Sequence, residues 1–196
     1  YQAAYNMLSP DHADRIFVVL GTSHYGEPNR FGLTRKPFVT PYGKARTETR
    51  LVDELERRAG DAVKMEDYCH AVEHSIEFQV VFLQHVLGPD VRILPILCGS
   101  FAPSIYHGGK PEDDPRVAQF FDVLGDVAER QAGAAAPFAI QPRFAGALSG
   151  RSNVAPTPST AIIVMYQPRA SGVPVVLSSQ VTNNCVDPPN IATGNE

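Results

Sequence analysis

The sequence predicts an α/β fold with a central, mainly parallel or mixed sheet flanked by helices. Two largely apolar runs, at 15–20 and 91–97, have the composition of strands that are buried on both faces. Three segments with helical apolar spacing, at 49–59, 76–87 and 116–130, alternate with these strands. Strands that alternate with helices are typical of a sheet whose faces are covered by helices.

The first strand leads to a residue that can carry chemistry. A short helix is expected over Tyr1 to Leu8, closed by Ser9-Pro10, and the residues Ile16 to Leu20 then form the strand. Gly21 lets the chain turn and leaves His24 at the carboxyl end of the strand, the edge at which open α/β sheets bind ligands. An imidazole there can coordinate a metal, move a proton or hydrogen-bond its own loop. The strand alone does not choose between these roles.

The two helices that follow are predicted from apolar spacing and from their end signals. The helix at 49–59 has apolar residues at i, i+1 and i+4, and Gly60 comes directly after it. The helix at 76–87 has one apolar stripe and stops at Gly88-Pro89. That stripe consists of Ile76, Val80, Leu83 and Leu87. Each helix is therefore expected to pack one face against the sheet.

The character of the chain changes near residue 131. Residues 132–196 contain 5 charged side chains in 65 positions, against 33 in the preceding 131, and they contain eight prolines. We therefore expect an α/β domain over 1–131, followed by an atypical Pro/Ala/Ser/Thr-rich tail. This tail is either disordered or not native to the preceding fold. Within it, Thr160 to Met165 and Val173 to Leu177 have the composition of strands.

Composition excludes several classes of function. A net charge of −4 and a pI near 5.9 argue against a nucleic-acid or anionic-membrane surface. No run approaches the length of about 18 apolar residues that a transmembrane helix needs. The N-terminus lacks a signal-peptide pattern, and Cys69, Cys98 and Cys185 form no CxxC pair, so we expect a cytoplasmic protein with reduced thiols. Because the chain does not begin with methionine, we expect it to be part of a longer protein.

A second informative segment, His70 to Glu77, contains two imidazoles and two carboxylates. If it is helical throughout, His70, His74 and Glu77 share one face and can offer ligands to a transition metal. Glu77 can equally orient His74 or act as a general base. The structural alternative is a polar helix N-terminus, where Glu73 and Glu77 interact favourably with the helix dipole. The spacing differs from the His-Glu-x-x-His motif, and phosphate-binding glycine motifs and the Gly-x-Ser-x-Gly elbow are absent.

Five motifs occur in an order that resembles one known family. They are Gly21–His24, Thr40–Gly43, Glu73–Glu77, Phe82–Gln84 and Ile93–Gly99. In this order they are similar to the Memo-like family, also called AmmeMemoRadiSam system protein B. The resemblance covers a fragment of about residues 1–131. It implies an α/β fold related to that of the class III extradiol ring-cleaving dioxygenases, with a metal-binding cleft.

The resemblance also implies roles for individual residues. His24 matches a metal-ligand histidine. His74 and Glu77 match the family's His-Ser-x-Glu motif close to the cleft, where they would act as catalytic residues that move protons. The implied cofactor is a divalent metal, namely non-haem iron or alternatively copper or zinc. The implied function is that of a dioxygenase-like, metal-dependent oxidoreductase with a small-molecule or peptide ligand in the cleft.

Departures from the family pattern leave other functions open. The family's second ligand histidine lies in a segment upstream of Tyr1, and the position of its Asp-x-x-His motif falls at 137–143, which contains neither residue. Cys185 corresponds to a late cysteine ligand of some members but lacks the expected neighbours. Only His24 therefore matches a metal ligand. The alternatives are a non-catalytic binding or scaffold protein that retains the cleft, and an inactive fragment of the family.

Overall fold

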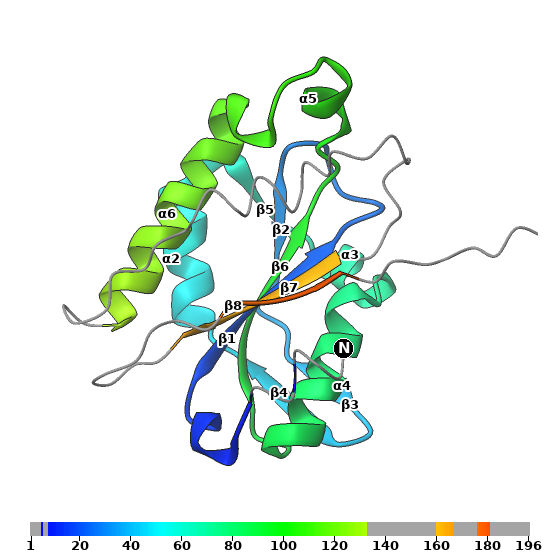
Figure 1. Ribbon diagram of the computed structural model, residues 1–196, viewed down its shortest axis with the longest axis vertical. Coiled ribbons are helices and arrows are strands. Elements are labelled where there is room, and N and C mark those ends of the chain that lie inside the picture. Colours follow the sequence, from blue (N-terminus) through cyan, green and yellow to red (C-terminus); the bar gives the residue numbers. More distant parts are fainter. Residues whose placement is uncertain (1–4, 6–7, 133–159, 167–175, 181–196) are drawn as a thin grey trace, which may run out of the picture.

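The computed structural model of the chain describes residues 5, 8–132, 160–166 and 176–180. A mixed sheet forms its centre (Figure 1). The strands are β1 (Ile16–Thr22), β2 (Phe31–Leu33), β3 (Phe38–Thr40), β4 (Gly43–Thr47), β5 (Val63–Met65), β6 (Arg92–Cys98), β7 (Thr160–Tyr166) and β8 (Val176–Gln180). They follow the order β3-β4-β6-β1-β7-β8, and β2 joins β5 to β6.

The directions of the strands make the sheet mixed. β6 runs parallel to both β1 and β4, whereas β7 runs antiparallel to β1 and β2 runs antiparallel to β6. The prediction of a central, mainly parallel or mixed sheet is confirmed, in its mixed form. The two strands predicted at 15–20 and 91–97 are β1 and β6, and they lie side by side at the centre of the sheet.

Helices cover both faces of this sheet. They are α2 (Thr49–Ala59), α3 (Asp67–Val72), α4 (Ser75–Leu87), α5 (Ala102–Tyr106) and α6 (Pro115–Ala132), with short 3₁₀ turns η1 (Pro10–His12), η2 (Gly60–Ala62) and η3 (Pro111–Asp113). The helices predicted at 49–59, 76–87 and 116–130 are confirmed as α2, α4 and α6. The short helix expected over Tyr1 to Leu8 falls almost entirely outside the described residues. Nowhere in the described part of the chain is a helix both long and apolar enough to cross a membrane.

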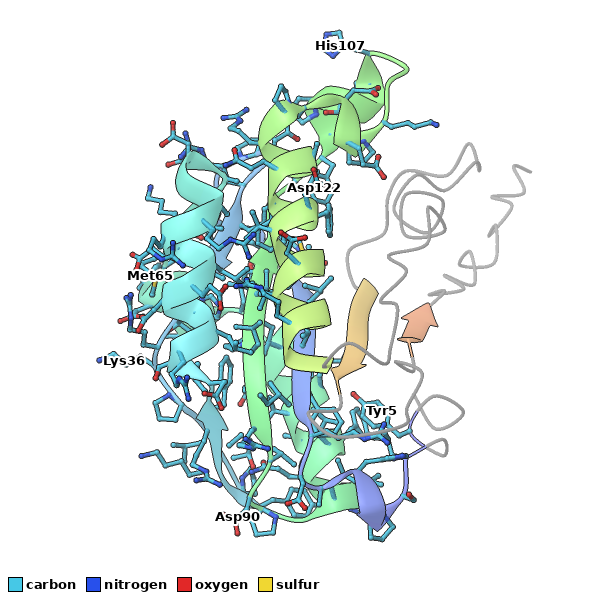
Figure 2. The ribbon with its side chains drawn as sticks, turned by 90° about the vertical axis from the view of Figure 1, so that its left-hand side faces the viewer. Tyr5, Lys36, Met65, Asp90, His107 and Asp122 are labelled. Carbon is cyan, nitrogen blue, oxygen red and sulfur yellow. The ribbon has the colours of Figure 1, made fainter. Side chains whose placement is uncertain are left out.

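β1 separates two apolar cores because its side chains alternate between the faces of the sheet. Ile16, Val18 and Leu20 pack with α2 and α6, which lie side by side on one face (Figure 2). Phe17 and Val19 pack on the opposite face with α4. All five side chains are buried, and burial stabilises each by about 1.5–3 kcal/mol. β1 is therefore held in the sheet by apolar packing on both of its faces.

Part of the charge-poor segment belongs to this sheet. Thr160–Tyr166 forms β7 beside β1, and Val176–Gln180 forms β8 beside β7. The strand expected at 160–165 is thus confirmed. Of the strand expected at 173–177, residues 173–175 lie outside the described residues. The proposed domain boundary at 131 stays a prediction.

Candidate functional site

His24 lies in the loop that follows β1, at the carboxyl end of the central strand. The backbone N–H of Ser23 donates to the carbonyl of Cys98 at 2.8 Å, which attaches the start of this loop to the end of β6. The Ser23 hydroxyl accepts a hydrogen bond from the backbone of Gly26 at 2.9 Å and closes a tight turn. Ser23 is buried, whereas the side chain of His24 is 48% exposed. The loop therefore presents the imidazole at the surface from a fixed backbone.

The segment His70 to Glu77 is not one continuous helix. α3 ends at Val72, Glu73 has an extended backbone with ψ 134°, and α4 begins at Ser75 after His74. His70, His74 and Glu77 therefore do not share one helical face. The break has a consequence for Glu73, because a residue between two helices can direct its side chain away from both.

Glu73 is the partner of His24. One oxygen of its carboxylate, Oε2, lies 2.9 Å from His24 Nδ1, and the other, Oε1, lies 3.1 Å from the same nitrogen. Oε1 also accepts a hydrogen bond from the backbone N–H of His24. The Glu73 side chain is 6% exposed. A buried carboxylate with these contacts selects the tautomer with hydrogen on Nδ1 and leaves the Nε2 lone pair of His24 available.

Close packing of α4 on β1 brings the two residues together. Gly21 has no side chain, and a Cβ placed there would lie 2.5 Å from Ser75 Oγ and 2.6 Å from Ile76 Cγ1. The Ser75 hydroxyl donates to the carbonyl of Thr22 at 2.9 Å and attaches the first turn of α4 to the end of β1. Glu73 immediately precedes this turn, so its carboxylate reaches the loop of His24.

His74 and Glu77 form a separate, exposed pair. His74 Nε2 and Glu77 Oε2 are 3.9 Å apart, and their side chains are 69% and 44% exposed. The His74 ring lies 6.0 Å, centroid to centroid, from that of Phe78. The structure thus brings the two predicted catalytic residues near each other, while Glu73 is the residue that contacts His24. Their catalytic roles stay predictions.

His70 is a buried core residue. It is 7% exposed, and its Nδ1–H donates to the carbonyl of Glu66 at 2.9 Å. Burial lowers the pKa of the His70 imidazole, although the hydrogen bond to Glu66 opposes this change. Its ring lies edge-on to that of Phe38. We therefore assign His70 to packing rather than to the site.

The described thiols do not extend the site. Burial, followed by the nearby Glu66 carboxylate, raises the pKa of the Cys69 thiol, and burial raises that of Cys98 to about 12. Cys69 and Cys98 are free cysteines, and Cys185 lies outside the described residues. Among the described residues, no group of three His, Cys, Asp or Glu side chains is arranged to hold a metal ion. Within the part of the chain that the structure describes, His24 is therefore the one histidine that is paired with a buried carboxylate.

Sequence reasoning missed the role of Glu73. It gave Glu73 only a favourable interaction with the helix dipole, at a polar helix N-terminus. A signal was present: the apolar stripe begins at Ile76, and Ser75 directly before it is a good helix-start residue. The helix predicted at 76–87 already left Glu73 outside it, but the spacing does not indicate which other element Glu73 contacts.

Comparisons with known proteins agree on one family. The family model described as Memo-like protein matches residues 1–107. A MEMO1 family protein of Methanococcoides burtonii is 34% identical over 83 residues, which are 42% of this chain and 30% of the relative. A MEMO1 family protein of Pyrococcus horikoshii is 31% identical over 99 residues, 48% of this chain and 34% of the relative. A MEMO1 family protein of Ignicoccus hospitalis is 34% identical over 104 residues, which are 52% of this chain and 36% of the relative. The chain spans about a third of the length of the curated relatives it matches. No solved structure matches it.

Proposed function

Since the chain belongs to the Memo-like protein family, we propose that it binds a divalent metal at a site to which His24 contributes one ligand. The observation that carries this proposal is the pairing of His24 Nδ1 with the buried Glu73 carboxylate at 2.9 Å. Iron is the first candidate for the metal, and copper and zinc are the alternatives, because all three accept imidazole nitrogen.

The pair has the chemistry of a metal-ligating histidine and its supporting carboxylate. Histidines that bind metals usually donate their other ring N–H to a carboxylate or carbonyl, which sets the tautomer and raises the basicity of the ligating nitrogen. Glu73 would do this for His24, whose Nε2 is available. Because a single imidazole holds a metal weakly, the proposed site needs further ligands besides His24.

The proposed reaction class is that of a dioxygenase-like, metal-dependent oxidoreductase acting on a small molecule. The chemistry that the metal supplies when bound is Lewis acidity toward an oxygen ligand. In this chain, His74 and Glu77 are the groups proposed to move protons, because both are exposed and lie 3.9 Å apart. Glu73 would keep the His24 ring oriented.

Equilibrium binding of Fe²⁺, Cu²⁺ and Zn²⁺ to the full chain at neutral pH tests the proposal. We expect His24→Ala to abolish binding and Glu73→Ala to weaken it by about 10–100-fold. Glu73→Gln keeps an acceptor for the Nδ1–H group and should have a smaller effect. His85→Ala is the matched control, because His85 is an exposed histidine of α4 whose Nδ1 lies 3.1 Å from the Tyr42 hydroxyl. Unchanged binding by His24→Ala would refute the assignment of His24.

A non-catalytic binding function is the second candidate, and exposed aromatic side chains favour it. Tyr25, next to His24, is 68% exposed, Phe78 beside His74 is 54% exposed, and Tyr68 of α3 is 74% exposed. Exposed aromatic groups beside a polar pair are suited to contact a ligand or a peptide. Oxygen consumption with catechol as the probe distinguishes the candidates. Consumption that His24→Ala abolishes would exclude a purely binding role, whereas metal-loaded protein that consumes no oxygen would favour it.

A further inference from the structure

The loop that carries His24 is fixed at its far end by Asn29. Asn29 is 7% exposed, and its backbone N–H donates to the carbonyl of Ser100 at 3.0 Å. Its φ of 56° lies in the left-handed region, where it is the one described non-glycine residue. Gly99 lies directly beneath the loop, since a Cβ there would be 2.1 Å from the carbonyl oxygen of Glu27. The loop is therefore held against the segment after β6 at both of its ends.

The side chain of Asn29 connects this loop to the start of α6. Asn29 Nδ2 donates to Asp114 Oδ2 at 2.9 Å. Asp114 also accepts from the Arg116 guanidinium at 2.8 Å and from the Arg116 backbone N–H at 2.9 Å, as a residue that caps a helix does. The Arg116 guanidinium, with help from Asn29, holds the pKa of Asp114 well below its usual range. Asp114 is thus a charged acceptor for Asn29 at neutral pH.

Two features of Asn29 are energetically unfavourable. Its backbone adopts a conformation that side chains with a Cβ rarely use, and its Oδ1 is buried without a hydrogen-bond partner among the described residues. Reversing the amide would not help, because it would place Oδ1 against the Asp114 carboxylate. Unfavourable local features of this kind persist where the surrounding structure uses the conformation. The loop beside Asn29 is the one that presents His24.

We propose that Asn29 is a positioning residue for His24, acting through its hydrogen bond to Asp114. The bond holds the left-handed turn at Asn29, the turn holds the loop against the segment after β6, and the loop holds His24 against Glu73. The inference rests on the proposed function for the importance of the His24–Glu73 pair. The positioning itself requires no bound metal.

NMR of the full, metal-free chain tests the positioning. The bonded Nδ1–H proton of His24 gives a signal whose exchange with water reports the contact with Glu73, and ¹⁵N shifts of the ring report its tautomer. Asn29→Gly is the informative variant, because glycine tolerates the positive φ and removes only the side-chain bond. We expect this variant to lose the protected Nδ1–H signal and to bind Zn²⁺ about tenfold more weakly. Far-UV circular dichroism would verify that it is folded.

Two further variants make the test specific. Asn29→Asp places two carboxylates opposite each other, so it should also lose the His24 Nδ1–H signal. Combining Asn29→Asp with Asp114→Asn again places an amide donor opposite a carboxylate acceptor, so the double variant should recover the signal. Lys64→Met is the matched control, because it removes an exposed ion pair with Glu27 in the same loop and should leave the signal unchanged.

The outcomes separate this inference from the proposed function. The positioning role would be overturned if folded Asn29→Gly kept the wild-type His24 Nδ1–H signal. It would also be overturned if the double variant Asn29→Asp with Asp114→Asn did not recover that signal. Loss and recovery of the signal in a chain that binds no metal would leave the positioning role supported and the proposed metal function refuted.

Discussion

Replacing Gly21 with alanine tests whether the close packing of α4 on β1 builds the site. The new Cβ would lie 2.5 Å from Ser75 Oγ and 2.6 Å from Ile76 Cγ1, whereas ordinary contacts are 3.4–4 Å. Either α4 retreats from β1 by about 1 Å or both side chains leave their present positions. The backbone at Gly21 is not in the left-handed region, so the overlap alone opposes alanine.

The structure sets the size of the expected effect. Ser75 can rotate away, but it then loses its hydrogen bond to the Thr22 carbonyl, which contributes about 1 kcal/mol. Ile76 is 1% exposed, and relieving its overlap costs about 1–3 kcal/mol. Alanine recovers about 0.5–1 kcal/mol, because glycine loses more backbone freedom on folding. The free energy of unfolding should therefore decrease by about 1–3.5 kcal/mol.

Urea unfolding followed by far-UV circular dichroism measures this decrease, since the chain has no tryptophan. Ser75→Ala, alone and combined with Gly21→Ala, is the control. Because the combined variant lacks the Ser75 hydroxyl that overlaps the new methyl group, its loss should be smaller than the sum of the two single losses. A decrease below about 0.5 kcal/mol for Gly21→Ala, or strictly additive losses, would refute the packing argument.

Two further predictions concern stability. Burial lowers the pKa of His70 in the folded state below the unfolded value of about 6.5, so the unfolded chain binds more protons as the pH falls. The free energy of unfolding is therefore not reduced by His70 above about pH 6.5, and it decreases as the pH falls below this value. His70→Gln should reduce this loss when unfolding is measured at pH 7 and pH 5, and an unchanged pH dependence would contradict the assignment. Phe120→Ala should lower the free energy of unfolding by about 3–5 kcal/mol, because its buried ring stacks on Phe31 with centroids 3.6 Å apart. Tyr106→Ala, at a side chain that is 79% exposed, should change it by less than about 0.5 kcal/mol, and similar losses in the two variants would contradict the core assignment.

Local spacing was sufficient to predict the main elements of the fold. The helix at 49–59 has the bounds of α2, because its apolar residues at i, i+1 and i+4 face the sheet and Gly60 follows its last residue. The apolar run 16–20 became a central strand because five consecutive buried side chains need cover on both faces. Patterns of this kind record which side chains are buried, so they predict element type well.

The same patterns do not record which segments pair or in which direction. A strand that is buried on both faces has the same composition beside a parallel or an antiparallel neighbour. The antiparallel pairing of β7 with β1 joins residues more than a hundred positions apart and was not predicted. The strand expected at 160–165 lies in the sheet, but its composition did not indicate that it would pair with β1.

For the candidate site, too, some features follow from the sequence and others from the tertiary structure. The sequence by itself determined that His24 follows a buried strand, and therefore lies at the carboxyl edge of a sheet where ligands bind. Tertiary structure alone decided that its partner is Glu73, which is 49 positions away, rather than His74 or Glu77. The physical reason is that a hydrogen bond needs its two atoms within about 3 Å, and this distance depends on how closely α4 packs over Gly21.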